Sequence, residues 1–226
     1  MSRTVSGVVV RPIASLLCVL SAGLVAACGV PASPGPKAVD GVRSLIDTTY
    51  YTVSGTNPQE WVASSAAAAA RAGLSPRALA MTANVNKWVY TARPSEFGCE
   101  PHDATVILGI TFVMPRLASE SGVKQEDLAA WRGLVRYLWV HEQTHASIAM
   151  RSAIEFRDSL RVLHSGECGL LTTHVSSVAK GIADRYTALH RALDDREHAA
   201  QHSAGQIAQF RGSRLSVDTL FRDAVP

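Results

Sequence analysis

Two histidines and a glutamate are spaced for metal chemistry in the stretch WVHEQTHASIA, residues 139 to 149. His141 and His145 lie four positions apart, so on a helix their imidazoles stand one above the other and can converge on one ion. Glu142 projects about 100° around the helix from the first histidine, where it can take a proton from water rather than bind the metal. This H-E-x-x-H pattern predicts a zinc site with Glu142 as the general base of a hydrolase.

The residues around this pattern predict one long helix, from about residue 124 to residue 163. Steps of four and three place six of its residues on one stripe: Leu134, Leu138, His141, His145, Ile148 and Ser152. The apolar neighbours Val140, Ile148 and Ala149 favour an ordered site over a surface motif formed by chance. The alternative is an amphipathic helix that carries polar residues at its edge and binds no metal.

The third ligand must come from another part of the chain, since a catalytic zinc needs three protein ligands and an open position for water. A second long helix, predicted from about residue 171 to beyond residue 201, contains the stretch EHAAQH. His198 and His202 are again four positions apart there, and Glu197 precedes them. Any of these three side chains could complete the site. The remaining histidines lack such company in the sequence: His102, His164, His174 and His190.

The first 27 residues have the features of an export signal. Arg3 and Arg11 flank a mostly apolar lead-in, and the apolar run over residues 12–24 is too short to span a bilayer comfortably. It ends in VAAC, residues 25 to 28, which resembles the bacterial signal whose cysteine is acylated and becomes the mature N-terminus. We therefore expect a lipoprotein signal peptide over residues 1–27 and a lipid anchor on Cys28. The alternative is an ordinary signal peptide or a short membrane anchor.

The stretch 28–44 contains a cluster of proline, glycine and serine that predicts a flexible tether. Cys18 would leave with the signal and Cys28 would carry lipid, so Cys99 and Cys168 remain for pairing. Outside the cytoplasm such a pair favours a disulfide, with two free thiols as the alternative. Its loop of 168 − 99 = 69 residues would stabilise the fold by about 4 kcal/mol in the chain-entropy model.

Three strands are predicted over residues 48–54, 87–91 and 104–115, which are rich in β-branched or aromatic residues. A helix over about 58–72, capped by Asn57 or Thr56, follows the first strand, and a loop over 93–103 holds Cys99. These elements predict an α+β domain over residues 45–226, in which a small antiparallel sheet of about three to four strands packs on the HEQTH helix and the second long helix. The net charge of +3 without a basic run argues against nucleic acid as a partner.

The chain resembles a bacterial family described as predicted secreted zinc-dependent proteases, otherwise domain of unknown function 922. The resemblance runs from YTVSG at residues 51–55 to HEQTH, and it includes Trp88, Tyr90, Cys99 and Cys168. The family's C-terminal pattern of aspartate, threonine, histidine-glycine and glutamine looks like Glu197, Ala200, His202-Ser203 and Gln206 here, with three positions departing from it. The resemblance implies a zincin-like fold and favours His202 over His198 as the third zinc ligand.

Two classes of function follow from these features. The first is a zinc peptidase, lipid-anchored to the outer face of the bacterial cell membrane, that cuts peptides or proteins of the cell envelope. An extended substrate could pair with the edge of the predicted strand Thr105–Val113. The second is a non-catalytic zinc-binding envelope lipoprotein that binds a partner. A zinc amidase that acts on cell-wall peptides would share the metal chemistry of the first.

Overall fold

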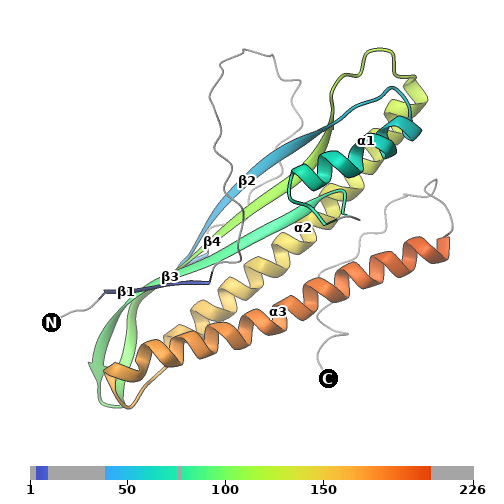
Figure 1. Ribbon diagram of the computed structural model, residues 1–226. Helices are drawn as coiled ribbons and strands as arrows, with labels where there is room; N and C mark the ends of the chain where they lie inside the picture. The colour runs from blue at the N-terminus through green and yellow to red at the C-terminus, as the bar shows by residue number, and fades with distance from the viewer. Residues whose placement is uncertain (1–3, 10–38, 76–77, 205–226) are drawn as a thin grey trace, which may run out of the picture.

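The computed structural model describes residues 4–9, 39–75 and 78–204, and within them the side chains of 39–75 and 78–197. The strands are β1 (Thr4–Val9), β2 (Val42–Val53), β3 (Met81–Ser95) and β4 (Gly98–Leu117). The helices are α1 (Pro58–Arg71), α2 (Gln125–Val162) and α3 (Cys168–Ala204), as Figure 1 shows. This architecture confirms the predicted α+β class and both long helices.

The four strands form one mixed sheet in the order β1-β3-β4-β2. β3 pairs antiparallel with both β1 and β4, whereas β2 pairs parallel with β4 from Val42↔Val106 to Val53↔Leu117. The sequence predicted a small antiparallel sheet, and this prediction is wrong for the pair β2 and β4. The reason is that β2 and β3 are joined through α1 rather than by a tight turn. This longer connection lets β3 pair on the side of β4 opposite β2, and the β3–β4 hairpin then brings β4 back parallel to β2.

The predicted loop over residues 93–103 is instead the tip of the β3–β4 hairpin, where pairing continues to Ser95↔Gly98. Arg93 and Glu100 face each other across the tip and form an ion pair. Gly98 has a φ of 109°, and a Cβ there would lie 2.3 Å from the backbone oxygen of Ser165. The tip therefore requires glycine at this position, because it lies directly against the segment between α2 and α3.

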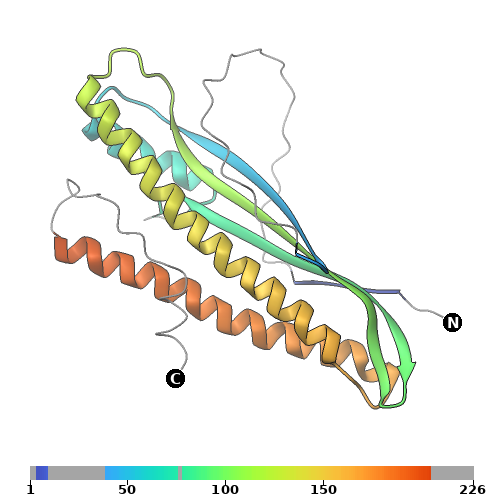
Figure 2. The ribbon, with the colours of Figure 1, turned by 180° about the vertical axis from the view of Figure 1, so that it is seen from behind.

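One face of the sheet is covered by α2, and α3 runs beside α2, as Figures 1 and 2 show from opposite sides. Alternate residues of β4 are buried there: Val106, Leu108, Ile110, Phe112 and Met114. They pack with apolar residues of both helices, including Ile148 of α2 and Leu193 of α3, which have no exposed surface. At about 1.5–3 kcal/mol for each fully buried apolar side chain, this layer fixes the position of both helices.

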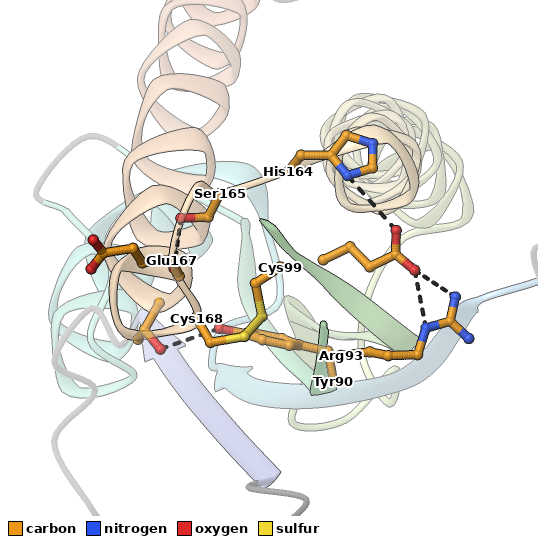
Figure 3. Close-up of a disulfide and its surroundings, with 9 residues drawn as sticks. Tyr90, Arg93, Cys99, His164, Ser165, Glu167 and Cys168 are labelled. Atoms are coloured by element: carbon orange, nitrogen blue, oxygen red, sulfur yellow. Dashed lines mark hydrogen bonds and ion pairs between the residues drawn. A yellow bond between two sulfur atoms is a disulfide. The ribbon is translucent and has the colours of Figure 1, made fainter. Parts of the chain in front are cut away.

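The disulfide predicted from the sequence joins Cys99 at the hairpin tip to Cys168 at the start of α3, with 5.0 Å between the Cα atoms (Figure 3). Two backbone hydrogen bonds beside it join Cys99 to Ser165, at 2.7 and 2.8 Å. The predicted N-cap of α1 is also confirmed, since Asn57 Oδ1 accepts a hydrogen bond from the Glu60 amide. The disulfide and its two backbone hydrogen bonds fix the hairpin tip to the start of α3, and the N-cap fixes the start of α1.

The proposed anchor residue Cys28 lies outside the described residues, as does most of the predicted signal peptide 1–27. β1 occupies residues 4–9 of that segment, and β2 begins at Val42, inside the predicted tether 28–44. Within the described ranges, no helix combines the length and the apolar composition needed to cross a bilayer.

Candidate metal centre

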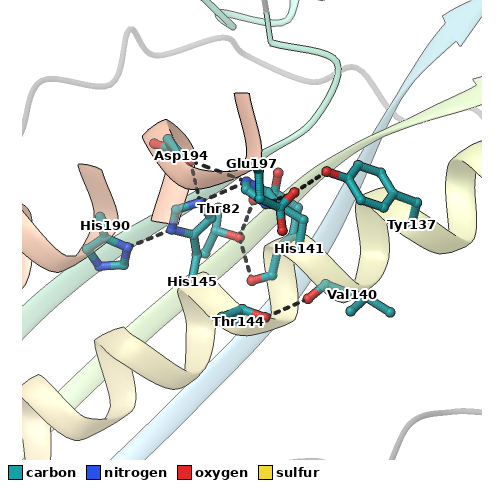
Figure 4. Close-up of polar contacts among 10 residues, drawn as sticks. Thr82, Tyr137, Val140, His141, Thr144, His145, His190, Asp194 and Glu197 are labelled. Carbon is teal, nitrogen blue, oxygen red and sulfur yellow. Dashed lines mark hydrogen bonds and ion pairs between the residues drawn. The ribbon is translucent and has the colours of Figure 1, made fainter. Parts of the chain in front are cut away.

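His141 and His145, which Figure 4 labels, point to a different neighbour of α2 from the one that Glu142 contacts. His141 and His145 face α3, where Asp194 lies within reach of both rings. Glu142 lies on the adjacent side of the helix and contacts Thr82 of β3. The two expected roles therefore lie on adjacent sides of the helix, with the imidazoles toward α3 and the carboxylate toward β3.

Three donor atoms form a compact triangle between α2 and α3. His145 Nε2 lies 3.0 Å from His141 Nε2 and 2.9 Å from Asp194 Oδ1, and the last two atoms are 3.3 Å apart. Zinc bonds of about 2.0–2.1 Å in a tetrahedral site place ligand atoms about 3.3 Å apart. The donor set of two imidazoles and one carboxylate could hold zinc with one position left for water, after two of the three separations widen slightly from 2.9 and 3.0 Å.

Asp194 was missed by the sequence analysis, which looked for a third ligand further along α3. It reaches the site because α3 turns one face toward α2, as its buried residues Ile182, Tyr186 and Leu193 show. His190, Asp194 and Glu197 continue this face at steps of four and three. The signal was present in the sequence as a polar continuation of an apolar stripe, but it needed the pairing of the two helices to be recognised.

Glu142 is almost entirely buried, with 3% of its surface exposed. Thr82 Oγ1 lies 2.7 Å from Glu142 Oε2 and 3.0 Å from the Glu142 backbone oxygen. Burial raises the pKa of Glu142 above its ordinary value, although the Thr82 hydrogen bond and the nearby histidines oppose the rise. A carboxylate with a raised pKa is suited to accept and return a proton near neutral pH.

The charges around the triangle depend on each other. Burial by itself would lower the pKa of His141, but its hydrogen bond to Asp194 and the charge of Glu197 outweigh burial and raise that pKa to about 10. Burial likewise opposes ionisation of Asp194, yet the hydrogen bonds from His141 and His145 hold its pKa well below the ordinary range. In the metal-free protein the cluster is therefore held together by protons that a bound cation would replace.

Two further contacts support the outer nitrogens of the histidines. His145 Nδ1 lies 2.7 Å from His190 Nδ1, and the two rings are stacked at 5.0 Å between centroids. Glu197 Oε2 lies 3.1 Å from His141 Nδ1, which is within ion-pair distance. The direction of this contact does not suit a hydrogen bond, so the buried Nδ1 has no hydrogen-bond partner in the described part of the chain. Tyr137 donates a hydrogen bond to the same Glu197 oxygen. Ring partners of this kind orient metal-binding histidines.

The structure thus brings together His141, Glu142 and His145 of the predicted site, and Glu197, which the sequence offered as an alternative ligand. Glu197 contacts the side of His141 that faces away from the triangle. His198 and His202 belong to the last two turns of α3, where side chains are not described, so the prediction of His202 as third ligand stays open. No partner for His190 was recognised in the sequence, but in the structure its ring contacts His145 of α2.

The model of a bacterial family of unknown function, DUF922, matches residues 48–203 of the chain. The chain belongs to this family. The match covers all of the described strands and helices except β1, the first residues of β2 and the last residue of α3. No curated protein and no solved structure matches the chain.

Proposed function

We propose that this DUF922 member is a zinc-dependent peptidase that is lipid-anchored through Cys28 on the outer face of the bacterial cell membrane. The single observation that carries the proposal is the triangle of His141, His145 and Asp194 next to the buried carboxylate of Glu142. These residues support a metal because their donor types are those of catalytic zinc sites and their donor atoms lie close together. When bound, zinc would polarise a substrate carbonyl and lower the pKa of water.

The proton transfers fall to Glu142. Its carboxylate would accept a proton from the attacking water and pass it to the leaving amine. Burial raises its pKa, which favours this exchange, and its position directly after His141 on α2 supports a role beside the proposed metal. Asp194 would be the third ligand beside His141 and His145. His190 would orient the imidazole of His145, and Glu197 would balance the charge of His141.

The predicted docking edge on the strand Thr105–Val113 is wrong, because β4 lies inside the sheet with β3 on one side and β2 on the other. The hydrogen bonds from Val106 N to Gly41 O and from Ala118 N to Val53 O assign the even residues of β4 to β2. Its odd residues therefore bond to β3, which leaves the backbone groups of Thr82 and Asn84 directed to the outer edge.

This outer edge of β3 includes Thr82, whose side chain contacts Glu142, and it supports a peptide substrate. Thr82 and Asn84 pair with β4 on their inner side, but β1 pairs with β3 only at residues 86–91, so no described strand lies along the outer side of Thr82 and Asn84. An extended peptide could add to the sheet there and lie beside the metal ligands. If residues 1–27 are removed as a signal peptide, β1 leaves with them and the free edge becomes longer.

Replacement of the base tests the proposal. We expect Glu142→Gln to retain zinc and to lose peptide hydrolysis by about 100-fold to 10,000-fold, because the amide cannot accept the proton. The measurements are zinc content and turnover of a fluorogenic peptide library by the purified protein. Gln143→Ala is the matched control, since Gln143 is the exposed neighbour on the same helix. Unchanged turnover in Glu142→Gln would sink the mechanism.

A further inference from the structure

The hydroxyl of Thr82 is the feature of the site that the metal chemistry does not account for. We propose that Thr82 is a positioning residue that holds the carboxylate of Glu142 in the orientation needed for proton transfer. This inference rests on the proposed function, because it assigns Thr82 a role in the reaction of the same site. It comes from the 2.7 Å contact between Thr82 Oγ1 and Glu142 Oε2, which joins β3 to α2 across the layers of the fold.

The geometry favours donation from Thr82 to the carboxylate. A threonine hydroxyl has a single proton, and here it faces both Oε2 at 2.7 Å and the Glu142 backbone oxygen at 3.0 Å. Hydroxyl bonds to carboxylates are shorter than bonds to neutral oxygens, which agrees with the closer contact. The contact engages Oε2, so in this proposal Oε1 would accept the proton of water.

Thr82 is held rigidly enough to do this. It lies inside β3 and pairs with Phe112 of β4, so its backbone position is fixed by the sheet. Its β-branched side chain has few accessible rotamers, and the side chain of Phe112 beside it is buried against Trp139 of α2. Glu142, in contrast, is a long side chain on a helix and would otherwise lose its orientation to rotation about three bonds.

The same residue also faces the outer edge of the sheet. The backbone of Thr82 is directed outward, where a peptide strand would add, while its side chain points to the base. One residue would therefore set the distance between a bound peptide backbone and the group that transfers the proton. Misplacement by about 1 Å can cost roughly 100-fold in rate, so even a small shift of this contact should appear in kcat.

The test compares Thr82→Val with Thr82→Ser. Valine keeps the shape and the β-branching but removes the donor, whereas serine keeps the donor and loses only a methyl group. Thr91→Val is the matched control, because Thr91 lies on the same strand and its hydroxyl donates a hydrogen bond away from the site, to the backbone oxygen of His102 at 3.1 Å. Zinc affinity, kcat and KM on a fluorogenic peptide, and the crystal structure of each zinc-loaded variant are measured on the purified protein.

We expect Thr82→Val to lower kcat by about 10- to 100-fold, with KM and zinc affinity within about twofold of wild type. Thr82→Ser should recover most of the activity, and Thr91→Val should behave as wild type. A Thr82→Val variant with full kcat would overturn the assignment, and so would one that loses zinc and activity together, since that result indicates a structural role.

Failure of the proposed function is recognised separately. If wild-type protein binds zinc but hydrolyses no peptide, the peptidase proposal fails, and the crystal structures decide the role of Thr82. A Glu142 carboxylate that moves in Thr82→Val and stays in place in Thr82→Ser supports the positioning role. An unmoved carboxylate in Thr82→Val rejects it.

Discussion

The two halves of α3 are attached to the rest of the molecule by opposite means. Its first turns are held by the Cys99–Cys168 disulfide and by the fully buried Val175. Its later turns meet α2 through His190, Asp194 and Glu197, with Leu193 as the one fully buried apolar residue of that half among the described side chains. The first attachment depends on burial and a covalent bond, whereas the second depends on protons or on a cation.

The comparison indicates that one end of α3 contributes stability, while the other end carries the groups of the candidate site. The disulfide end needs no ligand, because apolar burial and the covalent bond are satisfied within the chain. The polar end gathers three imidazoles and two carboxylates in a partly buried space, an arrangement that is costly unless every group is paired. Variants at each end show whether the stability of the disulfide end and the zinc affinity of the polar end are independent.

Removal of the disulfide should have the largest effect, and it should be an effect on stability. We expect Cys99→Ala together with Cys168→Ala to lower the free energy of unfolding by about 4 kcal/mol, because the unfolded chain regains the entropy of the open loop. Urea unfolding of the metal-free protein measures this loss. Zinc affinity of the folded variant should stay unchanged, and a large fall in that affinity would show that the two ends are coupled.

Replacement of Asp194 should have the largest effect on metal binding. Loss of an outer partner of a ligand typically costs 10- to 100-fold in affinity, so loss of a ligand itself should cost more than about 100-fold. We expect Asp194→Ala to cross this limit in competition with a chromophoric chelator, with Asp195→Ala, its exposed neighbour, as control. His202→Ala serves as the decisive comparison, since a larger loss in that variant would make His202 the third ligand.

A smaller effect on zinc affinity is expected from His190, which contacts the outer nitrogen of the proposed ligand His145. His190→Ala should lower zinc affinity by about tenfold, because His145 loses the ring that orients its Nδ1. The exposed His174 of the same helix provides the control variant His174→Ala. Equal zinc affinities in the two variants would show that the stacked pair contributes packing alone.

The sequence predicted those features that depend on short-range spacing. HEQTH on a helix, the two long helices and the cap of α1 follow from periodicity and from residue types within a few turns. The disulfide followed from elimination among four cysteines, with the export signal as the premise. In each case the necessary information lies within one segment or in a simple count.

The features that were missed depend on the pairing of distant segments. Asp194 and His190 become site residues only when α3 lies antiparallel to α2, and neither residue stands out on its own helix. Thr82 belongs to a strand whose predicted core was residues 87–91, so its contact with Glu142 was invisible before the strand was known to begin at Met81. The parallel pairing of β2 with β4 likewise depends on the route of the chain around α1.

The parallel pairing of β2 also bears on the order in which the molecule assembles. Val42 meets Val106 across 106 − 42 = 64 residues, whereas His145 and Asp194 are 194 − 145 = 49 residues apart within a helical hairpin. Helices form in about a microsecond, while distant strand pairs must first overcome the entropy of closing a long loop. If zinc binds as proposed, it would therefore cross-link the helical hairpin over a shorter loop than the one that the pairing of β2 with β4 must close.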